Sequence, residues 1–142
     1  MSIEPSELNP IKALAKAAAN QAYAPYSQFK VGAVLLTKSG EIISGCNVEN
    51  VSYGLSNCAE RTAIFTAIAQ GVDPQSISKV VIYTPSDQVY SPCGACRQVL
   101  AEFLAPDTDI ISTCETGFES WTVASLLPHA FHFDINEYRN KS

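Results

Sequence analysis

Two short stretches of this sequence carry residues that can hold and use a metal ion: Asn57-Cys58-Ala59-Glu60-Arg61 and Ser91-Pro92-Cys93-Gly94-Ala95-Cys96. Together they offer three thiols and one carboxyl group. A catalytic zinc ion usually has three protein ligands and keeps a fourth position for water, whereas a structural zinc ion is closed by four ligands. We therefore interpret Cys58, Cys93 and Cys96 as the ligands of one zinc ion per chain, with Glu60 beside the open position.

Each cysteine of this set is expected in the first turn of a helix. We predict one helix from about residue 58 to 70 and another from 93 to about 104. Helix N-termini carry partial positive charge and free N–H groups, and both lower the pKa of a thiol. Cys93 and Cys96 lie three positions apart and share a helical face. If both helices begin at the same edge of a sheet, the three sulfur atoms meet at one point.

Two charged neighbours of the first cysteine are predicted to tune this centre. Three thiolates on Zn²⁺ leave a net charge of about −1, by charge arithmetic on deprotonated ligands. Arg61, three residues after Cys58 on the same helical face, is predicted to donate to a ligand sulfur, as outer partners of metal sites commonly do. Arg97 ranks lower because adjacent helical positions diverge. Glu60 is predicted to exchange protons with water and substrate, although a helix N-terminus also favours a glutamate for its charge alone.

Other interpretations of the cysteines explain less of the sequence. Cys93-x-x-Cys96 alone also suits a redox motif, but a thioredoxin-like protein would leave the earlier cysteine and its neighbouring carboxyl group without a role. A closed structural zinc site needs a fourth ligand, and nothing in the spacing of His129 or His132 favours either one. Of the five cysteines, Cys46 and Cys114 lie beside strand-like apolar runs and are interpreted as buried structural thiols.

The order of elements predicts a layered α/β domain spanning residues 1–142. Crossover helices between strands are typical of this class. The run at 79–84 is too continuously apolar to have a solvent-exposed face, so we expect this strand to be buried on both faces of the sheet. The tail beyond residue 134 is assigned no element. Besides the two helices above, we expect a helix over 7–23, either capped by Ser6 or starting further inward at Asn9-Pro10, and a short helix from 123 that ends at Pro128. The expected strands are 31–36, 41–46, 79–84, 109–113 and 118–123, the last at an edge.

Charge and hydropathy restrict the partners. The net charge is −5 and the nine basic residues are scattered, whereas binding to a nucleic-acid backbone relies on clustered Lys and Arg. We therefore expect a small neutral substrate and no nucleic acid. No apolar run approaches the roughly 18 residues of a membrane span, and the first residues lack the basic and apolar segments of a secretory signal. The expected location is the cytoplasm.

With these motifs in place, the sequence resembles the short, homotetrameric form of cytidine deaminase. The resemblance begins with Cys58-Ala59-Glu60-Arg61 and Pro92-Cys93-Gly94-Ala95-Cys96-Arg97-Gln98, a pattern shared by zinc deaminases. It extends over roughly residues 10 to 133 through Tyr23-Ala24-Pro25-Tyr26-Ser27 with Phe29, Val31-Gly32-Ala33, Gly45 to Asn50, and Leu126-Leu127-Pro128 with Phe131. The tail after Phe133 has no clear counterpart in the family.

The resemblance implies a fold, an activity and a set of contacts. The implied fold is a three-layer α/β/α sandwich on a five-stranded mixed sheet. The implied activity is hydrolytic deamination of cytidine and deoxycytidine in pyrimidine salvage. By the same resemblance, Phe29 stacks on the pyrimidine, and Asn47 and Glu49 form hydrogen bonds with the ribose hydroxyls. The Ala59 N–H and the Ser91 carbonyl bind the base edge. Tyr53 and Phe131 extend across subunit interfaces to the site of a neighbouring subunit.

Two rival functions stay open at the level of sequence. One is a deaminase that acts on a modified cytosine nucleoside or a cytosine-containing antibiotic, against which Asn47 and Glu49 argue because they suit a sugar. The other is a non-enzymatic binding module stabilised by structural zinc. In that case the metal should have four protein ligands and no exchangeable water.

Overall fold

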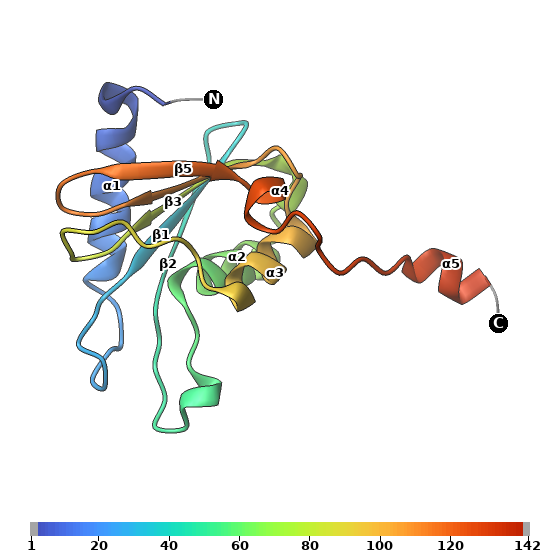
Figure 1. Cartoon of the computed structure of the whole chain (residues 1–142), viewed down its shortest axis with the longest axis horizontal. Coiled ribbons are helices and arrows are strands. Elements are labelled where there is room, and N and C mark those ends of the chain that lie inside the picture. The colour runs from blue at the N-terminus through green and yellow to red at the C-terminus, as the bar shows by residue number, and fades with distance from the viewer. Residues whose placement is uncertain (1–2, 141–142) are drawn as a thin grey trace.

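A five-stranded mixed sheet organises the chain, in the order β2-β1-β3-β4-β5 (Figure 1). The computed structural model describes residues 3–140. The β3 and β4 strands are parallel, and the other neighbours are antiparallel. All five predicted strands are present, and β5 lies at an edge as expected. Their bounds are β1 Gly32–Thr37, β2 Ile42–Cys46, β3 Ile77–Tyr83, β4 Asp109–Thr113 and β5 Phe118–Thr122.

Helices cover both faces of this sheet, which confirms the predicted three layers. Helix α1 (Pro5–Ala19) packs on one face, and α2 (Ala59–Ala69) and α3 (Gly94–Phe103) lie on the other (Figure 1). Successive side chains of a strand point to opposite faces. On β3, Val81 therefore joins the cluster beneath α1, while Val80 and Ile82 join the cluster beneath α2 and α3. The prediction that this strand is buried on both sides is confirmed.

The first helix differs from its predicted bounds at both ends. It begins at Pro5, where a missing N–H costs nothing, and the preceding Glu4 rather than Ser6 takes the capping position without a side-chain hydrogen bond. It ends at Ala19 instead of continuing to residue 23. The cause lies far along the chain: the N–H of Tyr23 donates to the Asn47 carbonyl at 3.0 Å, and Tyr23 accepts from the Glu49 N–H at 2.8 Å. Helix cannot continue through a residue bound in this way.

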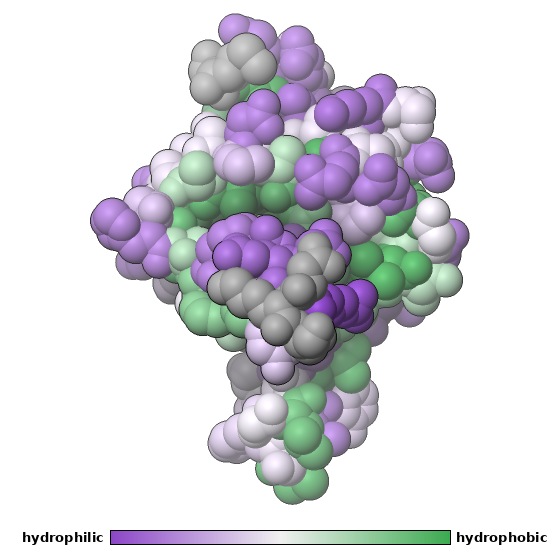
Figure 2. Space-filling view, turned by 90° about the vertical axis from the view of Figure 1, so that its right-hand side faces the viewer, coloured by the Kyte–Doolittle hydropathy of each residue, from purple (hydrophilic) through white to green (hydrophobic). Residues whose placement is uncertain are grey.

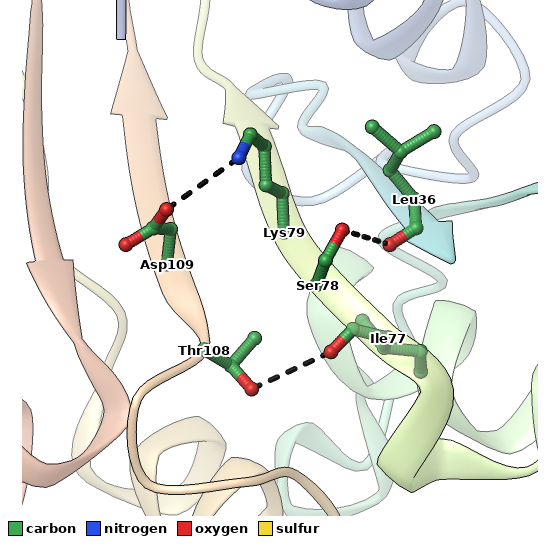
Figure 3. A network of polar contacts seen from close by, with 6 residues as sticks. All are labelled: Leu36, Ile77, Ser78, Lys79, Thr108 and Asp109. Carbon is green, nitrogen blue, oxygen red and sulfur yellow. Dashed lines mark hydrogen bonds and ion pairs between the residues drawn. The ribbon is translucent and has the colours of Figure 1, made fainter. Parts of the chain in front are cut away.

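The register of the two parallel strands, β3 and β4, is secured near the start of each strand (Figure 3). Lys79 and Asp109 are register partners, and their charged groups lie 3.5 Å apart in a pair that is mostly buried. In the same region, the Thr108 hydroxyl donates to the Ile77 carbonyl at 3.5 Å, and the Ser78 hydroxyl donates to the Leu36 carbonyl at 3.1 Å. A slip of one residue would break these contacts and reverse the faces of the strand.

The remaining elements are short. They are the 3-10 turns η1 (Tyr53–Leu55) and η2 (Pro74–Ser76), helix α4 (Val123–Leu126) and helix α5 (Ile135–Asn140). Helix α4 agrees with the predicted short helix before Pro128. Helix α5 was not expected, and it lies on a segment that extends away from the sheet (Figure 1). Within residues 3–140, no helix combines the length and apolar character that crossing a membrane requires.

Candidate zinc centre and substrate cavity

The three predicted ligands come together. The Sγ atoms of Cys58, Cys93 and Cys96 all lie within 4.8 Å of one another, and those of Cys58 and Cys93 are 3.9 Å apart. Cys58 is the capping residue at the start of α2, and Cys93 holds the same position at the start of α3. The expectation that two helix N-termini converge on one point is therefore met.

A glycine lets the first of these helices approach the sheet. A Cβ atom on Gly45 of β2 would lie 2.4 Å from the Ala63 N atom and 2.7 Å from the Ala59 carbonyl oxygen. Only a residue without a side chain fits against the backbone of α2 at this point. This close approach sets the height of the N-terminus of α2, and hence of Cys58, above the sheet.

The electrostatics of the sulfur cluster suit a divalent cation. A hydrogen bond from Cys96 and the Arg61 guanidinium, whose Nη2 atom lies 3.2 Å from the Cys58 Sγ atom, lower the pKa of Cys58. The pKa of Cys96 is raised first by its hydrogen bond to Cys58, which holds the proton on Cys96, and then by burial. The charge of Cys58 raises it further, because a second negative charge beside the first is unfavourable. A single guanidinium cannot balance three thiolates. A thiolate-binding dication such as Zn²⁺ supplies the missing charge, so the residues present fit zinc.

Glu60 lies beside the sulfur cluster and is almost completely buried, with 6% of its surface exposed. Burial raises the pKa of this carboxyl group, and the nearby Cys58 thiolate raises it further. A carboxyl group with a raised pKa binds a proton more readily than an ordinary carboxyl group, as a group that exchanges protons with substrate must. Within residues 3–140, the metal-binding group consists of the three cysteines alone, with His129 and His132 outside it.

A cavity of about 270 Å³ reaches the sulfur cluster at Cys58, which forms part of its wall. It brings together most of the predicted contact residues from four separate parts of the chain. These are Phe29, Asn47, Glu49, Cys58, Ala59, Glu60 and Ser91. Ala59 is the first residue of α2, where backbone N–H groups have no acceptor within the helix. The cavity wall also includes Ser27, Thr84 and Tyr90. These three were not predicted as site residues, because their residue types alone do not indicate a binding role.

Asn47 and Glu49 already hold the loop that carries Phe29. The Asn47 side chain accepts from the Val31 N–H at 2.8 Å and donates to the Phe29 carbonyl at 2.9 Å. The Glu49 carboxylate accepts from the Ser27 hydroxyl and, at 3.1 Å each, from the N–H groups of residues 26 and 27. The hydrogen bonds from Ser27 lower the pKa of Glu49. Both side chains therefore shape the cavity wall whether or not they also contact a ligand.

Two predicted contact residues, Tyr53 and Phe131, lie outside the cavity. Tyr53 is 75% exposed on η1, and Phe131 is 76% exposed on the segment that follows α4. In Figure 2, apolar residues gather at the lower end of the molecule, where Figure 1 places the loop that carries η1. Val51 and Leu55 of this loop are likewise exposed. One chain by itself does not bring Tyr53 or Phe131 to the sulfur cluster.

The other cysteines and Arg97 also have defined places. Cys114 is buried as expected, whereas Cys46 is only partly buried. Arg97 was ranked below Arg61 as a partner of the ligand sulfurs, and its guanidinium donates instead to the Pro92 carbonyl, the Leu126 carbonyl and the Ser91 hydroxyl.

Comparison with known proteins gives one consistent result. The chain matches the family described as the cytidine and deoxycytidylate deaminase zinc-binding region over residues 6–112. A cytidine deaminase of Sporosarcina psychrophila is 49% identical over 82% of this chain and 85% of the relative. A crystal structure of cytidine deaminase from Burkholderia pseudomallei superposes with a TM-score of 0.83 at 45% identity, over 87% of this chain and 98% of that one. A blasticidin-S deaminase of Bacillus cereus is 33% identical over 69% of this chain and 74% of the relative.

Proposed function

The chain belongs to the cytidine and deoxycytidylate deaminase family, and on that premise we propose that it is a zinc-dependent cytidine deaminase that converts cytidine and deoxycytidine to uridine and deoxyuridine. The observation that carries this proposal is a cavity whose wall includes Cys58, Glu60 and Phe29, with the sulfur atoms of Cys93 and Cys96 within 4.8 Å of that of Cys58. A flat, neutral nucleoside suits a cavity of about 270 Å³ with few charged groups in its wall.

In this proposal, Cys58, Cys93 and Cys96 hold one zinc ion per chain. Bound there, zinc would supply a Lewis acid that lowers the pKa of water to about 7. Glu60 takes one proton from water and delivers it to the cytosine ring nitrogen beside the amine-bearing carbon, to which the water oxygen bonds. Glu60 then takes the second proton from this oxygen and passes it to the amine. The C–N bond breaks and ammonia leaves as the C–O bond becomes a carbonyl, so the two protons of water end on the ring nitrogen and on ammonia.

Other residues of the cavity bind the substrate and take no part in proton transfer. Phe29 stacks on the pyrimidine, and its ring already meets Tyr90 edge-on with centroids 6.1 Å apart. Asn47 and Glu49 bind the ribose hydroxyls, since an amide and a carboxylate together offer the donor and acceptors that hydroxyls need. The N–H of Ala59 and the carbonyl of Ser91 bind the base edge.

We also propose a homotetramer in the cytoplasm that serves pyrimidine salvage. Support comes from the exposed aromatic side chains of Tyr53 and Phe131 and from the apolar loop around η1, because surfaces of this kind mark protein interfaces. In the assembly, each of these two residues contacts the cavity of a neighbouring subunit. Light scattering coupled to gel filtration tests the tetramer, and a monomeric mass at assay concentration would exclude it.

The activity is tested by purifying the protein with zinc and following the loss of cytidine absorbance, with zinc content measured on the same sample. We expect about one zinc per chain and turnover of cytidine and deoxycytidine. A protein with zinc but no turnover of either nucleoside contradicts the proposal. Similarity to blasticidin-S deaminase supports a second candidate substrate, a cytosine-containing antibiotic, and blasticidin S belongs in the same assay. A non-enzymatic zinc module would deaminate none of these compounds.

A further inference from the structure

Arg97 of α3 makes three side-chain hydrogen bonds to three different residues. Its Nε atom donates to the Pro92 carbonyl at 2.8 Å, Nη2 donates to the Ser91 hydroxyl at 2.8 Å, and Nη1 donates to the Leu126 carbonyl at 3.0 Å. A guanidinium is a planar fork with five N–H donors, so these bonds fix directions as well as distances. Its main-chain N–H also donates to the Cys93 carbonyl at 2.9 Å.

These bonds act on the stretch that enters the zinc centre. Ser91 forms part of the cavity wall, and Cys93 offers a sulfur atom to the metal. The stretch from residue 84 to 92 has neither helix nor strand, and both Ser91 and Cys93 are exposed. Arg97 lies one helical turn into α3 and is partly buried. Its hydrogen bonds to Ser91 and Pro92 therefore attach the irregular segment to the first turns of α3.

The third bond reaches a part of the chain distant in sequence. The Leu126 carbonyl belongs to the last turn of α4, where carbonyl groups have no partner within the helix. The segment that leaves α4 carries Phe131 away from the sheet (Figure 1). Arg97 thus joins the wall of the cavity to the start of the C-terminal segment.

We propose that Arg97 is a positioning residue that sets the Ser91 carbonyl and the Cys93 sulfur in the geometry required for nucleoside binding. This inference rests on the proposed deaminase function. It assigns the two arginines next to ligand cysteines different tasks. Arg61 contacts a ligand sulfur directly, whereas Arg97 holds the backbone that presents another ligand.

The test compares Arg97→Met and Arg97→Lys with the wild type. We expect KM for cytidine and Kd for the product uridine, measured by calorimetry, each to rise about tenfold or more, because hydrogen bonds from a charged group are lost. Lysine should not restore affinity, since one ammonium group cannot make a fork of three bonds. Zinc content should stay near that of the wild type. Gln75→Met is a matched control, since it removes a 2.8 Å hydrogen bond to the Phe103 carbonyl at the far end of α3.

The outcomes separate positioning from mere stability. If both Arg97 variants lower the melting temperature as Gln75→Met does, with KM and uridine affinity unchanged, the proposal is wrong. Should neither variant fold, Ser91→Ala removes a single bond and is expected to raise KM about two- to fivefold, and an unchanged KM there also overturns the proposal. If the proposed deaminase function is wrong, the wild type will bind zinc but will not turn over cytidine. That result is distinct from failure of the Arg97 proposal.

Discussion

The Nη2 atom of Arg61 lies 3.2 Å from the Sγ atom of Cys58. The guanidinium is therefore the one positive charge in hydrogen-bond contact with a predicted zinc ligand among the described residues. Its Nε atom is buried without a hydrogen-bond partner, a cost that the contact with sulfur must offset. Three thiolates, one dication and one guanidinium sum to a neutral group, and neutrality favours burial of the centre.

Arg61→Gln should weaken zinc retention. The amide removes the positive charge that stabilises the Cys58 thiolate, so protons compete more strongly with the metal. We expect zinc release to a chelator at neutral pH to become about ten- to a hundredfold faster, the range typical of lost outer partners in metal sites. Arg61→Lys keeps the positive charge, so its rate of zinc release should lie between those of the wild type and Arg61→Gln. Equal release rates for the wild type and Arg61→Gln would show that Arg61 does not stabilise the ligand.

Glu60→Gln should separate metal binding from proton transfer. The amide has nearly the same shape but cannot carry the proton, so zinc content should remain near one per chain while kcat falls about a hundred- to ten-thousandfold. Glu102→Gln, an exposed position on α3, is the matched control and should leave the rate unchanged. Substantial activity in the Glu60 variant would exclude this residue as the proton carrier.

The dual use of Glu49 predicts a dependence on the sugar of the substrate. Glu49→Gln should raise KM for cytidine about tenfold, because it disturbs both the loop at residues 26–27 and the predicted bond to ribose. On 2′,3′-dideoxycytidine, which lacks both hydroxyls, the penalty should shrink to the loop contribution alone. Ser27→Ala removes two bonds within the loop, the one to Glu49 and the one that its hydroxyl accepts from the Phe29 N–H at 3.0 Å, and should penalise both substrates equally. An equal Glu49→Gln penalty on both substrates would remove the sugar contact from the proposal.

Much of the zinc centre could be predicted from the sequence because the information is local. Cysteine three residues before arginine, and two cysteines three residues apart after a proline, define helix N-termini and shared helical faces without knowledge of the rest of the chain. The same helical spacing indicated that Arg61 lies beside Cys58. The strands of the sheet were likewise evident from short apolar runs bounded by turn residues.

Features that depend on distant residues could not be predicted in this way. The end of α1 is set by the bridge between Tyr23 and Val48, which no local propensity encodes. The partners of Arg97 include the carbonyl of Leu126, and a backbone acceptor leaves no mark in the residue types. Helix α5 lies in a polar tail with weak periodicity, where a sequence offers little to distinguish helix from coil.

Tyr83 predicts a loss of stability at alkaline pH. Burial, and then a hydrogen bond to Glu115, raise the pKa of the Tyr83 phenol to about 12 in the folded protein, against about 10 when unfolded. The folded state thus binds the proton more tightly, so this contribution is complete below pH 10 and is lost as pH rises towards 12. Urea denaturation of the wild type and Tyr83→Phe between pH 9 and 11 measures it. The stability difference between them should narrow as pH rises, and a constant difference would contradict the assignment.

Gly45→Ala tests whether the sheet sets the position of the zinc centre. The new methyl group would lie 2.4 Å from the Ala63 N atom, so α2 must move or the variant must lose stability. Overpacking of this kind costs about 1–3 kcal/mol. Because backbone blocks the methyl group, the adjustment should displace the start of α2 and with it Cys58.

For Gly45→Ala we therefore expect reduced zinc affinity and reduced kcat/KM in protein that remains folded, beyond the loss of stability. Gly117→Ala is the control, since a Cβ atom there meets nothing within 4 Å, and it should leave both quantities unchanged. A Gly45 variant that is less stable but binds zinc and turns over cytidine like the wild type would mean that the two helix N-termini hold their geometry independently of β2. The converging sulfur atoms would then depend on α2 and α3 alone.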